Sequence, residues 1–124
     1  MRILLTGSDG FIGAALRRDL RAAGHRVVGT CYRRAPAEGE VFLDLTDAQT
    51  FGNIPEGPFD AVAHAAGIVD QRERRPRMVA VNAEGTRRLV RWAEKRRVPH
   101  FVFLSSITVY GWKTMGENRR EGET

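Results

Sequence analysis

The sequence predicts an α/β fold in which helices cover both faces of a doubly wound parallel sheet. Short apolar runs alternate along the chain with segments whose apolar residues recur at helical spacing, which is typical of this class. The apolar runs are nearly continuous, as in strands that are buried on both faces. Because crossovers between parallel strands are right-handed, we expect the strand order 3-2-1-4-5.

The first part of the chain is expected to contain three strands and one helix. A buried strand at Arg2–Thr6 leads through a glycine-rich turn into a helix over 11–23, and Gly24 supplies a C-terminal stop for that helix. A second strand lies within 25–32, and a short third strand covers 41–43. The apolar face of the helix is expected to comprise Ile12, Ala15, Leu16, Leu20 and Ala23.

The second part is expected to add two strands and a long helix. Thr46 or Asp47 could cap a brief helix before a loop that contains prolines and glycine. A fourth strand is predicted over 60–65, a long helix over 76–97 and a fifth strand over 100–105. The inward-facing residues of the long helix are expected to be Val79, Leu89, Val90 and Ala93.

The composition is that of one ordinary globular domain. The chain has 124 residues, a formal net charge of +5, 42% hydrophobic residues and 28% charged residues. We expect one domain over 1–111 and a polar loop or tail over 112–124. No apolar run approaches the roughly 20 residues of a membrane-spanning helix, and the first residues lead directly into a strand. We therefore expect a cytoplasmic protein without a signal peptide and without a membrane partner.

The basic excess is carried almost entirely by arginine and has two interpretations. It can indicate nucleic-acid binding, but the arginines are interleaved with glutamates and spread around the predicted long helix. Since no zinc-finger spacing or RNA-binding aromatic pair occurs, we expect no nucleic-acid partner, and anionic cofactors or substrates explain the charge as well. The histidines and the single cysteine, Cys31, fall on separate elements without ligand spacing, so no metal site is expected.

The turn after the first strand has the spacing of a phosphate-binding loop. Glycines at three-residue intervals allow a sharp turn, a close approach of the backbone to a pyrophosphate and tight packing of the helix on the strand. The helix that follows directs unpaired N–H groups toward the phosphates. The alternatives are a turn that binds nothing and, for Asp9, a role as helix cap. The predicted cofactor-binding residues of this turn are Gly7, Ser8, Asp9, Gly10, Phe11, Ile12 and Gly13.

The end of the second strand bears on the choice of dinucleotide. Folds that prefer NAD usually place an acid there, which accepts a hydrogen bond from the ribose 2′-hydroxyl. No acid occurs between Gly24 and Ala37, whereas Arg33 and Arg34 are adjacent and could bind a 2′-phosphate. We therefore expect NADP(H) to be favoured, with NAD(H) possible. The alternative is that both arginines are solvated loop residues.

Two further segments complete the cofactor site predicted from the residues. Asp44 and Leu45 follow the third strand, where a carboxylate could meet the adenine amino group, while Asp47 is equally well explained as a helix cap. The fourth strand ends in small residues that would let a cofactor lie close to the backbone. These are Ala65, Ala66 and Gly67. His64 lies inside the strand and is expected to be a packed core histidine rather than a catalyst.

Four motifs occur in order along the chain. They are T-G-x-x-G-F-I-G at 6–13, a small-residue turn at 64–67, V-N-x-x-G-T at 81–86 and S-S-x-x-V-Y-G at 105–111. Together they resemble the extended short-chain dehydrogenase/reductase family, in particular its NAD(P)-dependent sugar epimerases and dehydratases. The resemblance implies a Rossmann fold and hydride transfer between a nicotinamide and a carbon of a sugar or sugar nucleotide.

The resemblance also implies roles for three residues. Asn82 and Ser105 join the predicted cofactor site. Ser106 is the predicted catalytic residue, because the aligned serine in this family hydrogen-bonds the reacting carbonyl or hydroxyl. A serine pair that merely ends a strand is the structural alternative. Tyr110 is expected to line the pocket and is not the proton-transfer tyrosine.

The family's proton-transfer tyrosine belongs to a Y-x-x-x-K pair that these 124 residues do not contain. Tyr32 is followed four residues later by Pro36, and Tyr110 by Thr114. Two hypotheses stay open. The chain is the cofactor half of an epimerase, dehydratase or reductase whose later strands and substrate region lie outside this sequence, or it is a non-catalytic NADP(H)-binding or regulatory module.

Since the fifth strand would be an uncovered edge, we also expect a homo-oligomer.

Overall fold

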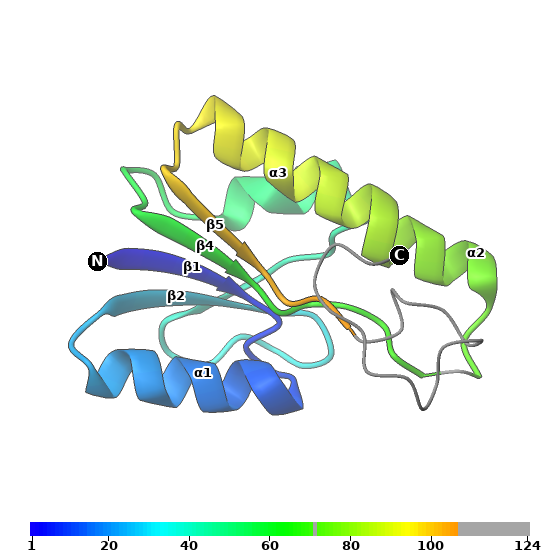
Figure 1. Cartoon of the computed structure of the whole chain (residues 1–124), viewed down its shortest axis with the longest axis horizontal. Helices are drawn as coiled ribbons and strands as arrows, with labels where there is room; N and C mark the ends of the chain where they lie inside the picture. The colour runs from blue at the N-terminus through cyan, green and yellow to red at the C-terminus, as the bar shows by residue number, and fades with distance from the viewer. Residues whose placement is uncertain (71, 107–124) are drawn as a thin grey trace, which may run out of the picture.

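The computed structural model describes residues 1–70 and 72–106, which form one five-stranded parallel sheet (Figure 1). The strand order β3-β2-β1-β4-β5 and the parallel pairing of every neighbour confirm the predicted fold class and topology. The expected tail over 112–124 and the domain boundary at 111 lie outside the described residues. The strands are β1 (Arg2–Thr6), β2 (Arg26–Cys31), β3 (Glu40–Phe42), β4 (Ala61–His64) and β5 (His100–Phe103).

Helices lie on both faces of the sheet. Figure 1 shows α1 on one side and the long helical segment, together with the short η1, on the other. Gly24 follows α1 with a φ of +88°, which confirms it as the stop, and Asp47 caps η1 by accepting a hydrogen bond from the Gln49 N–H at 3.0 Å. The helical elements are α1 (Phe11–Ala22), η1 (Ala48–Asn53), α2 (Arg75–Met78), η2 (Val79–Gly85) and α3 (Thr86–Lys95).

The three segments α2, η2 and α3 run as one continuous helix, as predicted, but its middle part, η2, is π-helical. The helix approaches the β3–η1 loop closely at Gly85, where a Cβ atom would lie 2.7 Å from the Cβ of Leu45. Within the wider turn, the Thr86 hydroxyl donates a hydrogen bond to the Asn82 carbonyl at 2.7 Å. A π-helical stretch in an α-helix often marks a functional position.

The main core lies between the sheet and the long helix. It consists of Leu4, Leu43, Leu45, Phe51, Ile54, Phe59, Val62, Leu89 and Ala93. Leu89 and Ala93 are buried as predicted and Val90 is half-buried, but Val79 is exposed, which corrects the expectation for that residue. The reason is that α2 and the start of η2 extend past the carboxyl ends of the strands, where no sheet lies beneath them (Figure 1).

The opposite face is covered less completely. Gly13 is the buried residue of α1, whereas Leu16 and Leu20 are half-buried and the remaining members of the predicted apolar face are exposed. On the edge strand β5, Val102 and Phe103 are 57% and 53% exposed. Apolar side chains are therefore exposed both on α1 and at the β5 edge of the part of the chain that the structure describes.

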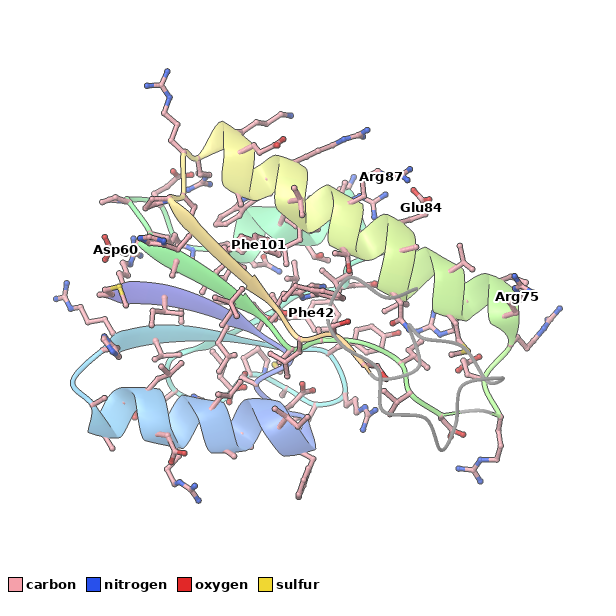
Figure 2. The ribbon with its side chains drawn as sticks, in the orientation of Figure 1. Phe42, Asp60, Arg75, Glu84, Arg87 and Phe101 are labelled. Carbon is pink, nitrogen blue, oxygen red and sulfur yellow. The ribbon has the colours of Figure 1, made fainter. Side chains whose placement is uncertain are left out.

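Several arginines on the surface form ion pairs with glutamates. Figure 2 shows Glu84 and Arg87 together on the outer face of the long helix, where their side chains pair at 3.2 Å. Arg96 pairs with Glu56 at 3.3 Å.

No helix among the described residues is both long and apolar enough to cross a bilayer.

Candidate functional site

A groove with a volume of about 290 Å³ opens at the carboxyl ends of the central strands. This is the edge at which doubly wound folds bind their ligands. Its lining brings together nine residues predicted from the sequence: Gly7, Asp9, Gly10, Arg33, Asp44, Leu45, Ala65, Ala66 and Gly67. The other lining residues are Thr30, Cys31, Tyr32, Leu43, Ile68, Asp70, Glu73, Arg77 and Val81.

The glycine turn forms one wall of the groove and tolerates only glycine at two positions. Gly7 has a φ of +70°, and a Cβ there would lie 2.7 Å from the Cα of Ala66. A Cβ on Gly13 would overlap the carbonyl oxygen of Gly7, so α1 packs directly on the turn. Gly10 is the N-cap of α1, with extended backbone and no side-chain cap. The first N–H groups of α1 therefore begin at the groove without intrahelical acceptors.

Phe11 and Ile12, the next two residues of the turn motif, do not line the groove. The side chain of Phe11 is 97% exposed and that of Ile12 is 52% exposed. Any part they take in holding a phosphate would use their backbone N–H groups in the first turn of α1.

Asp9 does not cap α1, which corrects that alternative. Its Oδ2 instead accepts hydrogen bonds from the N–H groups of Tyr32 and Arg33, both at 3.0 Å, just past the end of β2. Partial burial alone would raise the pKa of the Asp9 carboxyl, but hydrogen bonds from the N–H groups of Arg33, Tyr32 and Asp9 itself lower it below the ordinary value. The glycine turn thus places a carboxylate at the end of β2.

Ser8 lies beneath the turn in a buried polar cluster. Its Oγ is 2.7 Å from Glu40 Oε2 and 3.0 Å from the Thr30 carbonyl oxygen. Arg34 donates to both Glu40 oxygens, at 2.9 and 3.1 Å, and Arg17 lies 3.4 Å away. Burial would raise the pKa of Glu40, but the bonds from Ser8 and Arg34 and the positive charge of Arg17 lower it below its ordinary value. Arg34 is thus engaged by Glu40, and the groove lining includes Arg33 but not Arg34.

Arg77 reaches across the groove from α2. Its Nη2 donates to the Tyr32 hydroxyl at 2.9 Å, and its Nε lies 3.9 Å from the Glu73 carboxylate. Tyr32 in turn stacks on Phe42 of β3, with ring centroids 6.0 Å apart. The contact joins the end of β2 to the start of the long helix.

A chain of hydrogen bonds through His64 supports the opposite wall. The Ala66 N–H donates to Thr6 Oγ1 (3.2 Å), which lies 2.6 Å from His64 Nδ1, and His64 Nε2 lies 2.8 Å from Thr86 Oγ1. Because the Thr86 hydroxyl donates to the Asn82 carbonyl, it accepts from His64 Nε2–H, so Nδ1 accepts from Thr6. Burial lowers the pKa of His64 to about 4, so the ring is neutral at pH 7, and this tautomer provides a hydrogen bond for each ring nitrogen. His64 is a packed core histidine, as predicted.

Asn82 fixes the segment after β4 rather than lining the groove. Its side chain accepts from the Ile68 N–H at 2.7 Å and donates to the Ile68 carbonyl at 2.8 Å. The chain next to it is closely packed, since a Cβ on Gly67 would lie 3.3 Å from Asn82 Oδ1. The π-helical segment thus holds the Ala65–Gly67 wall in place.

The remaining predicted residues lie at the ends of β3 and β5. Asp44 lines the groove, and its Oδ1 accepts from the N–H and the hydroxyl of Thr46, at 2.9 and 2.7 Å. Ser105 and Ser106 are exposed just after β5 and do not line the groove. The rest of their motif, including Tyr110, lies outside the described residues.

The sequence model of the NAD dependent epimerase/dehydratase family matches residues 3–124. The chain belongs to this family. The 3-beta-hydroxysteroid dehydrogenase of Mycolicibacterium neoaurum is 32% identical over 120 residues, which cover 87% of this chain and 32% of that protein. The UDP-glucose 4-epimerase of Vibrio cholerae is 33% identical over 121 residues, which cover 91% of this chain and 37% of that protein.

Solved structures agree with the family assignment. A short-chain dehydrogenase/reductase superfamily protein from Agrobacterium tumefaciens with bound NAD superposes with a TM-score of 0.81 and 40% identity, over 98% of this chain and 36% of that one. MoeE5 in complex with UDP-glucose and NAD gives a TM-score of 0.76 and 30% identity, over 90% and 38%. The predicted resemblance is confirmed, and this epimerase/dehydratase family chain spans about a third of the length of the curated relatives described above.

Nine lining residues of this family member were not predicted from the sequence, and two groups among them show why. Thr30, Cys31 and Tyr32 could have been found, because the carboxyl ends of parallel strands meet at one edge of the sheet. Glu73 and Arg77 gave no such signal. Glu73 precedes the long helix and Arg77 lies in its first turn, past the ends of the strands. Helical periodicity does not show which part of a helix extends beyond the sheet.

Proposed function

We propose that this chain forms the nicotinamide-dinucleotide-binding part of an epimerase, dehydratase or reductase that acts on a sugar or sugar nucleotide. The observation that carries the proposal is the groove at the ends of β1 and β2, walled by the glycine turn at the start of α1. Two similar solved proteins support it: one holds NAD, and MoeE5 holds UDP-glucose and NAD. We assign this binding domain to residues 1–111.

The residues around the groove fit such a cofactor. The turn presents backbone without side chains at Gly7 and Gly10, and the N–H groups at the start of α1 would hold the pyrophosphate. Asp44 and Leu45 would contact the adenine, and the small residues after β4 would let the nicotinamide half lie against the backbone. When bound, the nicotinamide supplies a hydride acceptor or donor.

Ser106 is proposed to orient the substrate by a hydrogen bond to its reacting oxygen. β4 and β5 run in parallel with His64 opposite Phe103, and the Leu104 N–H donates to the His64 carbonyl at 3.1 Å. The segments that follow both strands therefore leave the sheet at the same edge. This brings Ser105 and Ser106 to the side of the sheet on which the groove opens.

Binding of NADH and NADPH to the full chain, measured by titration calorimetry, tests the proposal. Gly10→Ala should weaken both dinucleotides by about tenfold, because a methyl group would stand where backbone must approach the pyrophosphate. Gly52→Ala is the matched control, since a Cβ at Gly52 meets nothing within 4 Å. If the unsubstituted chain binds neither NADH nor NADPH, the proposed function is refuted.

A non-catalytic dinucleotide-binding or regulatory module is the second candidate function. The two candidates differ in the Y-x-x-x-K pair, which occurs at neither Tyr32 nor Tyr110. This candidate predicts dinucleotide binding without hydride transfer to any sugar nucleotide, whereas the first predicts turnover once a Y-x-x-x-K pair is present. A hydride-transfer assay with UDP-glucose separates the two when it is run on a protein in which these residues are accompanied by such a pair.

The preference for NADP(H) over NAD(H), predicted from Arg33 and Arg34, now depends mainly on one residue. Arg34 is bound to Glu40, whereas the guanidinium of Arg33 has no ion-pair partner among residues 1–70 and 72–106. The Agrobacterium tumefaciens protein and MoeE5, the two similar solved structures described above, both hold NAD. The preference therefore depends on how Arg33 is balanced by the other groups at the end of β2.

A further inference from the structure

The end of β2 lacks an acid of its own, but the fold brings a carboxylate to it from the glycine turn. We propose that Asp9 is the specificity-determining residue of the groove: its carboxylate accepts a hydrogen bond from the adenine-ribose 2′-hydroxyl and selects NAD(H) over NADP(H). This inference rests on the proposed dinucleotide-binding function. It reverses the preference that the two arginines predict.

Asp9 lies where a dinucleotide-binding fold recognises the adenine ribose. Asp9 lines the groove beside Thr30, Cys31 and Tyr32, the residues at the end of β2. In dinucleotide-binding folds this is where an acid meets the ribose hydroxyl. Both backbone hydrogen bonds from the β2 end reach Oδ2, and the described residues place no side-chain donor on Oδ1. Oδ1 is thus the atom with which a ribose hydroxyl would bond.

Asp9 also occupies the backbone donors that a phosphate would need. Successive N–H groups at a strand end form a natural anion site. Here the N–H groups of Tyr32 and Arg33 both donate to Asp9 at 3.0 Å, so the protein's own carboxylate already fills that site. The lowered pKa keeps Asp9 charged at neutral pH. A 2′-phosphate placed there would meet a like charge and find the N–H groups taken.

Three arginines near the groove could oppose this effect by binding a 2′-phosphate. Arg34 is held by two hydrogen bonds to Glu40, whose side chain is fully buried, and moving Arg34 to a phosphate would leave that carboxylate short of a partner. Arg77 donates to the Tyr32 hydroxyl and lies near Glu73. Within residues 1–70 and 72–106, Arg33 has no ion-pair partner, so the cofactor preference depends on the balance between Arg33 and Asp9.

The test measures dissociation constants for NADH and NADPH with the full chain and with Asp9→Asn. Asparagine keeps an oxygen for the Tyr32 and Arg33 N–H groups but replaces the charged Oδ1 by an amide. We expect the unsubstituted chain to bind NADH at least about tenfold more tightly than NADPH, and Asp9→Asn to shift that ratio toward NADPH by about tenfold. Asp19→Asn removes the same charge from the exposed face of α1 and should leave the ratio unchanged.

A ligand variant makes the test independent of protein folding. On the unsubstituted chain, NADH that lacks the adenine-ribose 2′-hydroxyl should bind about tenfold more weakly than NADH, and on Asp9→Asn the two should differ by less than about twofold. Tighter binding of NADPH than NADH by the unsubstituted chain would overturn the inference, as would an unchanged ratio in Asp9→Asn. Binding of neither dinucleotide would overturn the proposed function and this inference together.

Discussion

Lowering the pH from 7 to 5 should destabilise the fold by about 2 kcal/mol through His64 alone. The histidine is 1% exposed between β1 and the long helix, and burial lowers its pKa from the ordinary value of 6.5 to about 4. At pH 5 the unfolded chain therefore binds a proton that the folded chain does not, so the free energy of unfolding falls with pH. The loss begins as the pH falls through 6.5 and is complete below about 4.

The hydrogen-bond network gives this shift a structural cause. Thr6 donates to Nδ1 and Thr86 accepts from Nε2–H, so a second proton, on Nδ1, would take away the acceptor of the Thr6 hydroxyl. The aromatic neighbours of the ring are Phe101 and Phe103, which provide no compensating charge. The whole difference between the folded and unfolded pKa is worth about 3 kcal/mol, at 1.36 kcal/mol per unit.

Urea unfolding followed by circular dichroism at pH 7, 6 and 5 measures this effect. His64→Gln keeps a hydrogen-bond donor and an acceptor but does not titrate, so its free energy of unfolding should lose the His64 share of the pH dependence. The exposed His100 provides the matched control, because His100→Gln should retain the dependence of the unsubstituted chain. Equal slopes between pH 7 and 5 for the unsubstituted chain and His64→Gln would refute the reasoning.

Two further predictions concern packing and assembly. Gly85→Ala should lower the free energy of unfolding by about 1–3 kcal/mol, because its Cβ would lie 2.7 Å from the Cβ of Leu45, while Gly52→Ala should change it little in the same urea titration. Phe103→Lys at the exposed β5 edge should shift the chain toward monomer in light scattering, since a charge on an edge strand opposes pairing with a second copy. A monodisperse monomer before substitution would show that the edge does not self-associate.

The features predicted correctly from the sequence depend on neighbouring residues. The glycine spacing of the turn, the stop at Gly24, the Asp47 cap and the alternation of strands with helices are all local patterns, and right-handed crossovers convert them into a strand order. His64 could be assigned to the core because it stands inside an apolar strand. Val79 could not be placed, because periodicity assigns it to a helix face but does not show that the sheet ends before that turn.

The polar groups around the groove illustrate why its chemistry was harder to predict. The residues next to the β2 end along the chain include two arginines and no acid. In space, the acid comes from Asp9, 23 residues before Tyr32, and one of the arginines is neutralised by Glu40, six residues beyond it. Parallel strands bring the turn after β1 and the end of β2 to one edge. The charge that a cofactor would meet there is therefore the sum over both segments, and the residues next to β2 along the chain omit the negative charges of Asp9 and Glu40.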